Sequence, residues 1–264
     1  MPVSFVIDMD GVIYHGHRLI PGAREFVDRL RGGGHPFLFL TNNSQWTPRD
    51  LKHRLEHLGI VVEDSAFHTS ALATAEFLRT QRPGGSAFVI GGAGLTNALY
   101  EAGYHLTERD PDYVVVGDTR RYDYETIEHA IRLILGGARF IATNPDLTGP
   151  SEAGLQPACG ALVAPIELAT GRKPYFVGKP NPLMMRTALR KLGAHSSESF
   201  MIGDRMDTDI IGGTETGMQT ILVLSGVTDR NEIESFPYRP TFVFDDVGQI
   251  PVDQLVAQQK DAAD

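Results

Sequence analysis

The stretch Phe5-Val6-Ile7-Asp8-Met9-Asp10-Gly11-Val12 decides the fold of this chain. Its leading apolar residues, among them two that are β-branched, predict a buried β-strand. Because side chains alternate along a strand, Asp8 and Asp10 should leave the strand tip on the same side, and Gly11 lets the backbone turn away from them. Two carboxylates so near each other raise each other's pKa. A hard cation such as Mg²⁺, which prefers oxygen ligands, would stabilise the pair. An acidic turn after a strand is the alternative interpretation.

The length and composition limit the class of protein. At 264 residues the chain can bury a sizeable core and form more than one compact unit. Its formal net charge of −9 argues against a nucleic-acid backbone or an anionic membrane as the main partner. Cys159 is the only cysteine, so no intrachain disulfide can form, which suits a reducing cytoplasm. The first strand begins without a signal peptide before it, and no apolar run approaches the length of a membrane span. We therefore expect a cytoplasmic protein.

Short apolar strands alternate with helical segments along most of the chain. The strands are continuous apolar runs, as in a parallel sheet that is covered on both faces. This pattern predicts the α/β class, with a Rossmann-like, doubly wound parallel-sheet core and an inserted α/β unit. The rhythm breaks at Arg82-Pro83-Gly84-Gly85 and at Gly171-Arg172-Lys173-Pro174, and both stretches have the composition of linkers. These breaks place the core at residues 1–80 and 175–264 and the inserted unit at residues 81–174.

Polar side chains follow four of the strands expected in the core. In an open parallel sheet, ligands bind beyond the carboxyl ends of the strands, so these residues are expected to meet in one site. Taken singly, each group has another interpretation: a polar turn, a solvated loop lysine or an acidic helix start. One shared site accounts for all of them together. The residues are Asp8 and Asp10, Thr41 and Asn42, Lys179, and Asp204 with Asp209.

The order of these motifs resembles that of the haloacid dehalogenase (HAD) superfamily of phosphatases. Further stretches resemble the NagD-like branch, class IIA, in which a large cap is inserted between the second and third motifs. The resemblance covers nearly the whole chain and implies a HAD-like catalytic core with a substrate-specificity cap. The stretches that carry it are Asp8-Met9-Asp10-Gly11, Thr41-Asn42-Asn43-Ser44, Ala142-Thr143-Asn144-Pro145-Asp146, Ala158-Cys159-Gly160-Ala161-Leu162, Thr170-Gly171-Arg172-Lys173-Pro174, Val177-Gly178-Lys179-Pro180, and Gly203-Asp204 with Asp209.

The resemblance also implies a role for each motif residue. Asp8 would be the nucleophile that forms an aspartyl phosphate, and Asp10 would protonate the leaving group and later accept a proton from water. Mg²⁺ would be held by Asp8, by the backbone carbonyl of Asp10 and by Asp204, with water and the phosphate completing an octahedron. Supporting roles would fall to Asp209 and Asn43. The expected phosphate-binding residues are Asp10, Thr41, Asn42 and Lys179.

The cap resemblance implies a small phosphorylated metabolite as substrate and favours nucleoside monophosphates such as UMP or GMP. Asn43-Ser44 resembles the wider family, however, which keeps sugar phosphates, phosphoglycolate and 4-nitrophenyl phosphate as alternatives. Asn144 and Asp146 are candidates for contacting the leaving group from the cap, although ordinary turns at a cap strand end would have the same appearance. The sequence does not set the oligomeric state, and a homodimer is compatible with it.

One other class of protein and two further stretches have simpler explanations. A signalling receiver also phosphorylates an aspartate, but it needs neither Asp10 two residues later nor an insertion as large as residues 81–174. Gly91-Gly92-Ala93-Gly94 resembles a phosphate-binding turn, yet it lacks the Gly-Lys-Ser/Thr ending of a P-loop, so we predict a cap turn. Cys159 has no nearby base in the sequence, which predicts a packed, unreactive thiol.

Overall fold

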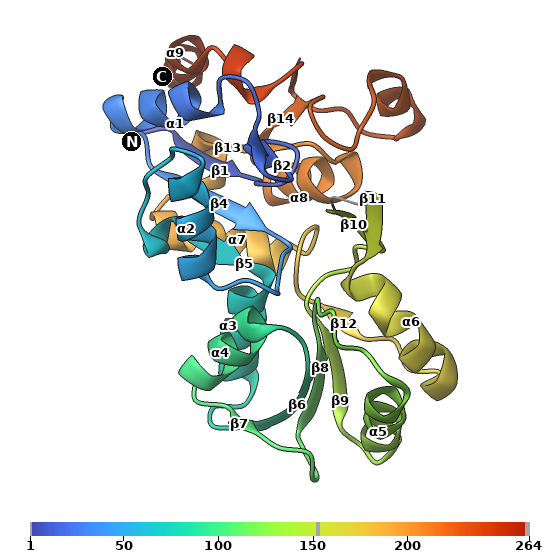
Figure 1. The fold of residues 1–264 in the computed structure, drawn as a ribbon. Helices are drawn as coiled ribbons and strands as arrows, with labels where there is room; N and C mark the ends of the chain where they lie inside the picture. The colour runs from blue at the N-terminus through green and yellow to red at the C-terminus, as the bar shows by residue number, and fades with distance from the viewer. Residues whose placement is uncertain (1, 152–153, 262–264) are drawn as a thin grey trace. The chain divides into compact units, whose positions relative to one another are not determined.

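The computed structural model describes residues 2–151 and 154–261. Contacts between residues divide the chain into two compact units, each built around a β-sheet of its own (Figure 1). The first unit consists of Met1–Thr41, Lys52–His68 and Pro182–Asp264, and the second consists of Asn42–Leu51 and Thr69–Asn181.

The first unit is built on a six-stranded sheet with the order β15-β14-β13-β1-β4-β5. β1 lies inside the sheet and pairs in parallel with β13 on one side and β4 on the other, so Val6 is opposite both Met201 and Leu38. The chain extends the sheet from β1 in one direction and later in the other. The carboxyl end of β1 is therefore a topological switch point, where open α/β sheets bind their ligands. The strands are β1 (Ser4–Ile7), β4 (Phe37–Thr41), β5 (Phe67–Thr69), β13 (Ser199–Gly203), β14 (Gln219–Val223) and β15 (Phe242–Phe244).

Helices cover both faces of this sheet. α1 packs with α9 on one face, and α7 packs with α8 on the other (Figure 1). The fully buried Phe5 of β1 stacks on Phe200 of β13 with ring centroids 5.5 Å apart and meets Phe26 of α1 edge-on at 6.5 Å. These contacts attach α1 to the centre of the sheet. The helices are α1 (Ala23–Gly32), α2 (Pro48–His57, whose first turn belongs to the second unit), α7 (Pro182–Leu192), α8 (Ile211–Thr216) and α9 (Val252–Asp261).

Shorter elements make up the connections of the first unit. A small antiparallel hairpin follows the acidic end of β1, and a π-helical segment follows β13. Single π-helical turns occur often at functional sites, so the segment after β13 marks a region to inspect. The elements are the hairpin strands β2 (Tyr14–His15) and β3 (Arg18–Leu19), the π-helical segment Met206–Ile210, and 3-10 helices at Asp64–Ala66, Ser196–Glu198, Arg230–Ser235 and Val247–Gln249.

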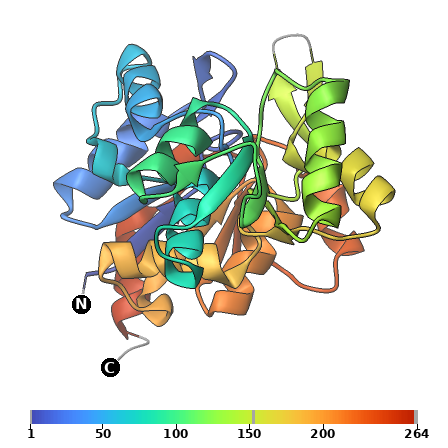
Figure 2. The same ribbon diagram turned by 90° about the horizontal axis from the view of Figure 1, so that it is seen from below.

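The second unit contains a five-stranded parallel sheet with the order β12-β9-β8-β6-β7. α3 packs with α4 on one side of it, and α5 packs with α6 on the other, as Figures 1 and 2 show. A separate antiparallel hairpin of β10 and β11 precedes α6. The elements are α3 (Ser70–Gln81), β6 (Ser86–Ile90), α4 (Ala93–Glu101), β7 (His105–Leu106), β8 (Tyr113–Val116), α5 (Tyr124–Leu135), β9 (Arg139–Ala142), β10 (Thr148–Ser151), β11 (Gly154–Pro157), α6 (Cys159–Thr170) and β12 (Tyr175–Phe176).

The strand β12 differs from the prediction, in which the second part of the core begins at residue 175. The sequence placed it in the core sheet, but β12 pairs in parallel with β9 of the second sheet. The linker-like stretch Gly171-Arg172-Lys173-Pro174 therefore connects α6 to β12 inside the second unit. A two-residue apolar strand carries no local signal for the sheet it joins, because that choice depends on a partner more than thirty residues away.

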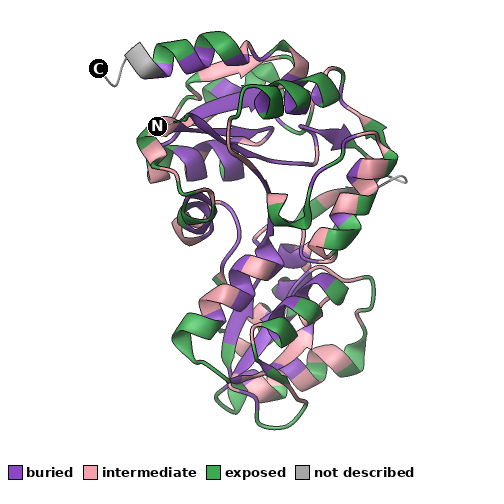
Figure 3. Cartoon of the chain, turned by 90° about the vertical axis from the view of Figure 1, so that its left-hand side faces the viewer, coloured by how far each residue is buried: buried purple, intermediate pink, exposed green. Residues whose placement is uncertain are grey.

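In both units the interior consists of the buried strands and the inward faces of the helices, as the colouring of Figure 3 shows. The α/β class and the parallel sheets agree with the sequence prediction. Among the residues that the structure describes, no helix combines the length and the hydropathy needed to cross a bilayer.

Candidate active site

Three aspartates of the first unit converge at the carboxyl end of its sheet. Asp8 follows β1, Asp204 follows the neighbouring strand β13, and Asp209 lies in the π-helical segment after β13. Each offers a carboxylate oxygen, and these oxygens all lie within 4.8 Å of one another. All three residues are buried, with at most 7% of their surface exposed. Like charges this close and this poorly solvated repel strongly unless positive charge balances them.

Glycines allow the backbone to approach these carboxylates closely. A Cβ atom at Gly226 would lie 1.9 Å from Oδ2 of Asp204, and one at Gly11, where φ is +79°, would lie 2.5 Å from the same oxygen. A Cβ atom at Gly203 would lie 2.2 Å from Cβ of Asp209. Since contacts below 3.0 Å are essentially never seen for a Cβ atom, each position needs glycine.

Backbone amides orient two of the carboxylates. The amide of Val227 donates to Oδ2 of Asp204 at 2.7 Å, and the amide of Arg205 donates to Oδ2 of Asp209 at 3.2 Å. The same loops are held to the acidic turn after β1, because the Ser225 hydroxyl donates to the carbonyl of Gly11 at 2.6 Å. Backbone amides thus hold the carboxylates of Asp204 and Asp209, and the Ser225 hydroxyl holds the turn that follows Asp8.

A hard divalent cation such as Mg²⁺ fits this set of donors. The group contains carboxylate oxygens only, and Mg²⁺ is held in proteins by a few such oxygens while keeping several of its waters. A divalent ion would also supply the positive charge that three converging carboxylates require. The sequence analysis expected Asp8 and Asp204 as ligands with Asp209 beside them, and the structure brings these three residues together.

The side chain of Asp10 lies beside Tyr14. The phenol of Tyr14 donates to Oδ2 of Asp10 at 3.4 Å. Burial, followed by the nearby charge of Asp10, raises the pKa of Tyr14 well above its usual value, so the hydroxyl stays protonated. The guanidinium of Arg54 lies 4.2 Å above the centre of the Tyr14 ring, and its Nη2 donates to the carbonyl of Gly16 at 2.6 Å. No sequence motif pointed to Tyr14 or Arg54.

Thr41 and Asn42 fall on either side of the division between the units. Thr41 ends β4 and is 3% exposed, while Asn42 begins the second unit. Within that unit, Oδ1 of Asn42 accepts a hydrogen bond from the amide of Lys179 at 2.8 Å, and Nδ2 donates to the Lys179 carbonyl at 3.1 Å. Nδ2 also donates to Oδ2 of Asp146 at 3.0 Å. The Asn42 side chain therefore fixes the backbone of the buried Lys179.

Lys179 needs a correction to its expected place. The sequence analysis attributed it to a strand end of the core sheet, but it follows β12 of the second sheet. The prediction used the rule that chemically useful residues gather at strand ends, and that rule holds within each sheet separately. The cap candidates Asn144 and Asp146 follow β9, the neighbour of β12, so they and Lys179 lie at the same edge of the second sheet.

Asp118, which is not among the predicted site residues, organises the polar groups at this edge. Its Oδ2 accepts from the hydroxyl of Ser44 at 2.7 Å and from Nδ2 of Asn144 at 3.2 Å, and its Oδ1 accepts from the amide of Cys159 at 2.9 Å. Asp118 follows β8, so the strand-end rule applied to the second sheet would have found it. Asn43 is engaged locally, since its Oδ1 accepts from the amides of Gln45 and Trp46 at 3.0 Å each.

The packed cysteine and the predicted cap turn both have structural explanations. Burial raises the pKa of the Cys159 thiol to about 12, which agrees with an unreactive packed cysteine. In the predicted cap turn, a Cβ atom at Gly94 would lie 2.6 Å from the carbonyl oxygen of Trp46, and the Gly94 amide donates to the carbonyl of Gln45 at 2.9 Å. The glycines of this turn thus allow another backbone segment of the second unit to pack against α4.

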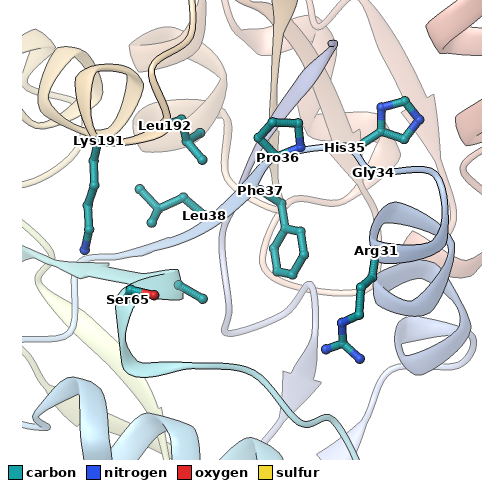
Figure 4. Close-up of a pocket in the computed structure, with 10 residues that line it drawn as sticks. Arg31, Gly34, His35, Pro36, Phe37, Leu38, Ser65, Lys191 and Leu192 are labelled. Carbon is teal, nitrogen blue, oxygen red and sulfur yellow. The ribbon is translucent and has the colours of Figure 1, made fainter.

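A hollow of about 500 Å³ lies at the opposite end of β4 from Thr41 (Figure 4). Its lining includes the start of β4 and the side chains of Arg31 and Lys191, and it contains none of the converging aspartates. Both cations are engaged, because Arg31 donates to the carbonyl of Val61 and Lys191 donates to that of Phe67 at 2.7 Å. The residues that line the hollow include no carboxylate, unlike the group of Asp8, Asp204 and Asp209.

Two family models match the chain. One, described as haloacid dehalogenase-like hydrolase, matches residues 5–105, and another, described as HAD-hydrolase-like, matches residues 176–250. The first match contains the aspartates after β1, and the second contains those after β13. The chain belongs to the haloacid dehalogenase-like hydrolases.

Relatives within this family narrow the class. A dihydroxyacetone phosphatase from Corynebacterium glutamicum (strain R) is 51% identical over 94% of this chain and 90% of its own length. The ribonucleotide monophosphatase NagD from Escherichia coli (strain K12) is 46% identical over 94% of this chain and 98% of its own length. The solved structure of NagD from the same strain superposes with a TM-score of 0.90 at 45% identity, covering 96% of this chain and 100% of that one. This protein is thus a NagD-like HAD phosphatase, as the resemblance of its motifs implied.

Proposed function

We propose that the protein is a Mg²⁺-dependent phosphomonoester hydrolase that works through an aspartyl-phosphate intermediate. The observation that carries this proposal is the convergence of Asp8, Asp204 and Asp209 at the switch point of the first sheet. A buried carboxylate among other carboxylates suits covalent phosphoryl transfer, because a divalent cation can balance the charges while one carboxylate attacks phosphorus.

In the first step, a carboxylate oxygen of Asp8 attacks phosphorus and the bond between phosphorus and the leaving oxygen breaks. The proton carried by Asp10 passes to that leaving oxygen, so an alcohol departs and a phosphorylated Asp8 remains. The position of Asp10 two residues after Asp8 supports this division of labour, and the contact of its carboxyl group with Tyr14 gives it a neighbour of its own.

In the second step, a water attacks the phosphorus of phosphorylated Asp8. Asp10, now deprotonated, accepts a proton from that water, while the bond between Asp8 and phosphorus breaks. Inorganic phosphate leaves, Asp8 returns to its carboxylate form, and Asp10 is protonated again. The two steps together hydrolyse one phosphomonoester with one water.

The remaining motif residues bind the ion and the phosphate. Mg²⁺ would be held by Asp8, Asp204 and the backbone carbonyl of Asp10, with Asp209 in support, and it would offset the charge that develops on the phosphoryl oxygens. We assign the binding of phosphoryl oxygens to Thr41, the backbone amide of Asn42 and Lys179. The hydrogen bonds of Asn42 to both backbone groups of Lys179 support this assignment, because they hold the lysine in one place. We assign Asn43 a supporting role, because its Oδ1 accepts a hydrogen bond from the amide of Gln45 and so stabilises the loop after Asn42.

We propose small phosphorylated metabolites as substrates. Nucleoside monophosphates are the candidates that the cap motifs favour. A triose phosphate is the second candidate, and the 51% identity to a dihydroxyacetone phosphatase supports it. Of the two cap candidates, we assign contact with the leaving group to Asp146 in preference to Asn144. Asn144 is 1% exposed, and its side-chain amide donates hydrogen bonds to Asn42 and Asp118.

A panel of phosphate esters assayed with Mg²⁺ and with a chelator tests this function. We expect phosphate release from at least one nucleoside monophosphate or triose phosphate, abolished by chelator and restored by added Mg²⁺. Asp8→Asn should lose essentially all turnover. Asp28→Asn, the same substitution at an exposed position of α1, should retain it. Full activity in chelator, or in Asp8→Asn, would contradict the proposal.

A further inference from the structure

We propose that Tyr14 is a positioning residue for Asp10: its hydroxyl holds the carboxyl group that transfers the proton to the leaving oxygen, and Arg54 holds the Tyr14 ring in place. This inference rests on the proposed function, because it assigns Tyr14 a role in the leaving-group step of that reaction. The observation behind it is the contact of 3.4 Å from the Tyr14 hydroxyl to Oδ2 of Asp10.

The backbone brings the two side chains together. Residues 9–14 form a closed turn in which the amide of Gly11 donates to the carbonyl of Tyr14 at 2.8 Å and the amide of Ile13 donates to that of Met9 at 2.8 Å. Asp10 and Tyr14 are also paired in an isolated parallel bridge. Tyr14 then begins the β2–β3 hairpin, so its backbone is held on both sides. The phenol reaches Asp10 because this turn closes.

The ring itself is held firmly. Tyr14 is 1% exposed, and the guanidinium of Arg54 lies 4.2 Å from its centre. A cation over an aromatic face is attracted to it, more strongly where water is excluded. Nη2 of Arg54 donates to the carbonyl of Gly16 at 2.6 Å, so Arg54 links α2 to the turn between β2 and β3. Rotation of the phenol away from Asp10 would break this packing.

A proton donor must be held in position to act. The side chain of Asp10 is only partly buried, and a fixed neighbour such as the Tyr14 hydroxyl limits rotation of its carboxyl group. General acid catalysis raises the rate of a reaction about 10²–10⁴-fold, and much of this rate increase is lost when the acid is misplaced. A contact of 3.4 Å is long for a hydroxyl donor, but contacts of catalytic groups commonly tighten when substrate binds.

The test uses leaving groups that differ in their need for a proton. Departure of an alkoxide from an alkyl phosphate requires protonation, whereas 4-nitrophenolate is stable enough to leave without it. The value of kcat/KM is compared because it reports the steps up to departure of the leaving group. For Tyr14→Phe we expect kcat/KM to fall about tenfold or more with glycerol phosphate and less than about threefold with 4-nitrophenyl phosphate.

Two further variants separate this role from a structural one. Arg54→Met should show the same selectivity with a smaller loss, because the ring keeps its hydroxyl but loses its clamp. Tyr104→Phe removes the hydroxyl of another buried tyrosine, which donates to backbone carbonyls of the second unit, and should leave both kcat/KM values unchanged. Thermal unfolding of each variant checks that it is folded.

Equal losses with both esters, or no loss in Tyr14→Phe, would overturn the proposal. The same holds if Arg54→Met loses activity without selectivity for the leaving group. These results differ from a failure of the proposed function, in which the unmodified protein would hydrolyse neither ester in the presence of Mg²⁺.

Discussion

Replacing His68 by phenylalanine should flatten the acid side of the stability profile. His68 lies in β5 and is 3% exposed, and its Nε2 has no hydrogen-bond partner among the residues that the structure describes. Burial, with the charges of Lys191 and Arg190 adding to it, lowers the pKa of His68 from 6.5 to about 3. Between these values the unfolded chain binds a proton that the folded chain does not. Above pH 6.5 His68 is neutral in both states and costs the folded protein nothing. As the pH falls from 6.5 toward 3, protonation of His68 in the unfolded chain lowers the free energy of unfolding.

The size of this effect follows from the shift. Between about pH 7.5 and about pH 5, protonation of His68 in the unfolded chain alone should lower the free energy of unfolding by about 2 kcal/mol. Urea unfolding at both pH values measures it, with the midpoint and the slope of each transition compared between the unmodified protein and His68→Phe. The phenylalanine ring keeps the packing of the strand but cannot take up a proton. Parallel pH profiles for the two proteins would refute this account of His68.

Two further predictions concern the aspartate group of the first unit and the contacts of Asn42 in the second. Gly226→Ala should lower the free energy of unfolding by about 1–3 kcal/mol and abolish turnover, because its Cβ atom would lie 1.9 Å from Oδ2 of Asp204; thermal unfolding and the phosphate-release assay measure both effects. Asn42→Asp should lower the free energy of unfolding by about 2–4 kcal/mol and reduce kcat, since it removes the donors to the Lys179 carbonyl and to Asp146 and adds a charge beside Asp146. Unchanged stability and kcat in Asn42→Asp would show that the lysine is held by other contacts.

Much of the first sheet could be predicted because its signals are local. The apolar run before Asp8 predicts a buried parallel strand, and the rule that ligands bind at carboxyl ends brings Asp8 and Asp204 together once β1 and β13 are neighbours. The spacing of Asp209 after Asp204 places it one turn further along the chain, where the structure has the π-helical segment.

Other features depend on pairings that the local sequence does not encode. The membership of β12 in the second sheet is decided by its partner β9, and with it the place of Lys179. Tyr14 could not be linked to Asp10, because the contact requires the closed turn of residues 9–14 and not a motif. Asp118 follows β8, so the strand-end rule points to it, but the groups that donate to it come from distant parts of the chain and are visible only in the structure.

The binding of a divalent cation by the three aspartates is the central claim, and a titration with Mn²⁺ followed by electron paramagnetic resonance tests it most directly. The unmodified protein should bind about one Mn²⁺ per chain, Mg²⁺ should displace it, and Asp204→Asn should weaken binding at least about 100-fold, since it removes a charged oxygen ligand. Equal Mn²⁺ affinity in the unmodified protein and in Asp204→Asn would contradict the account.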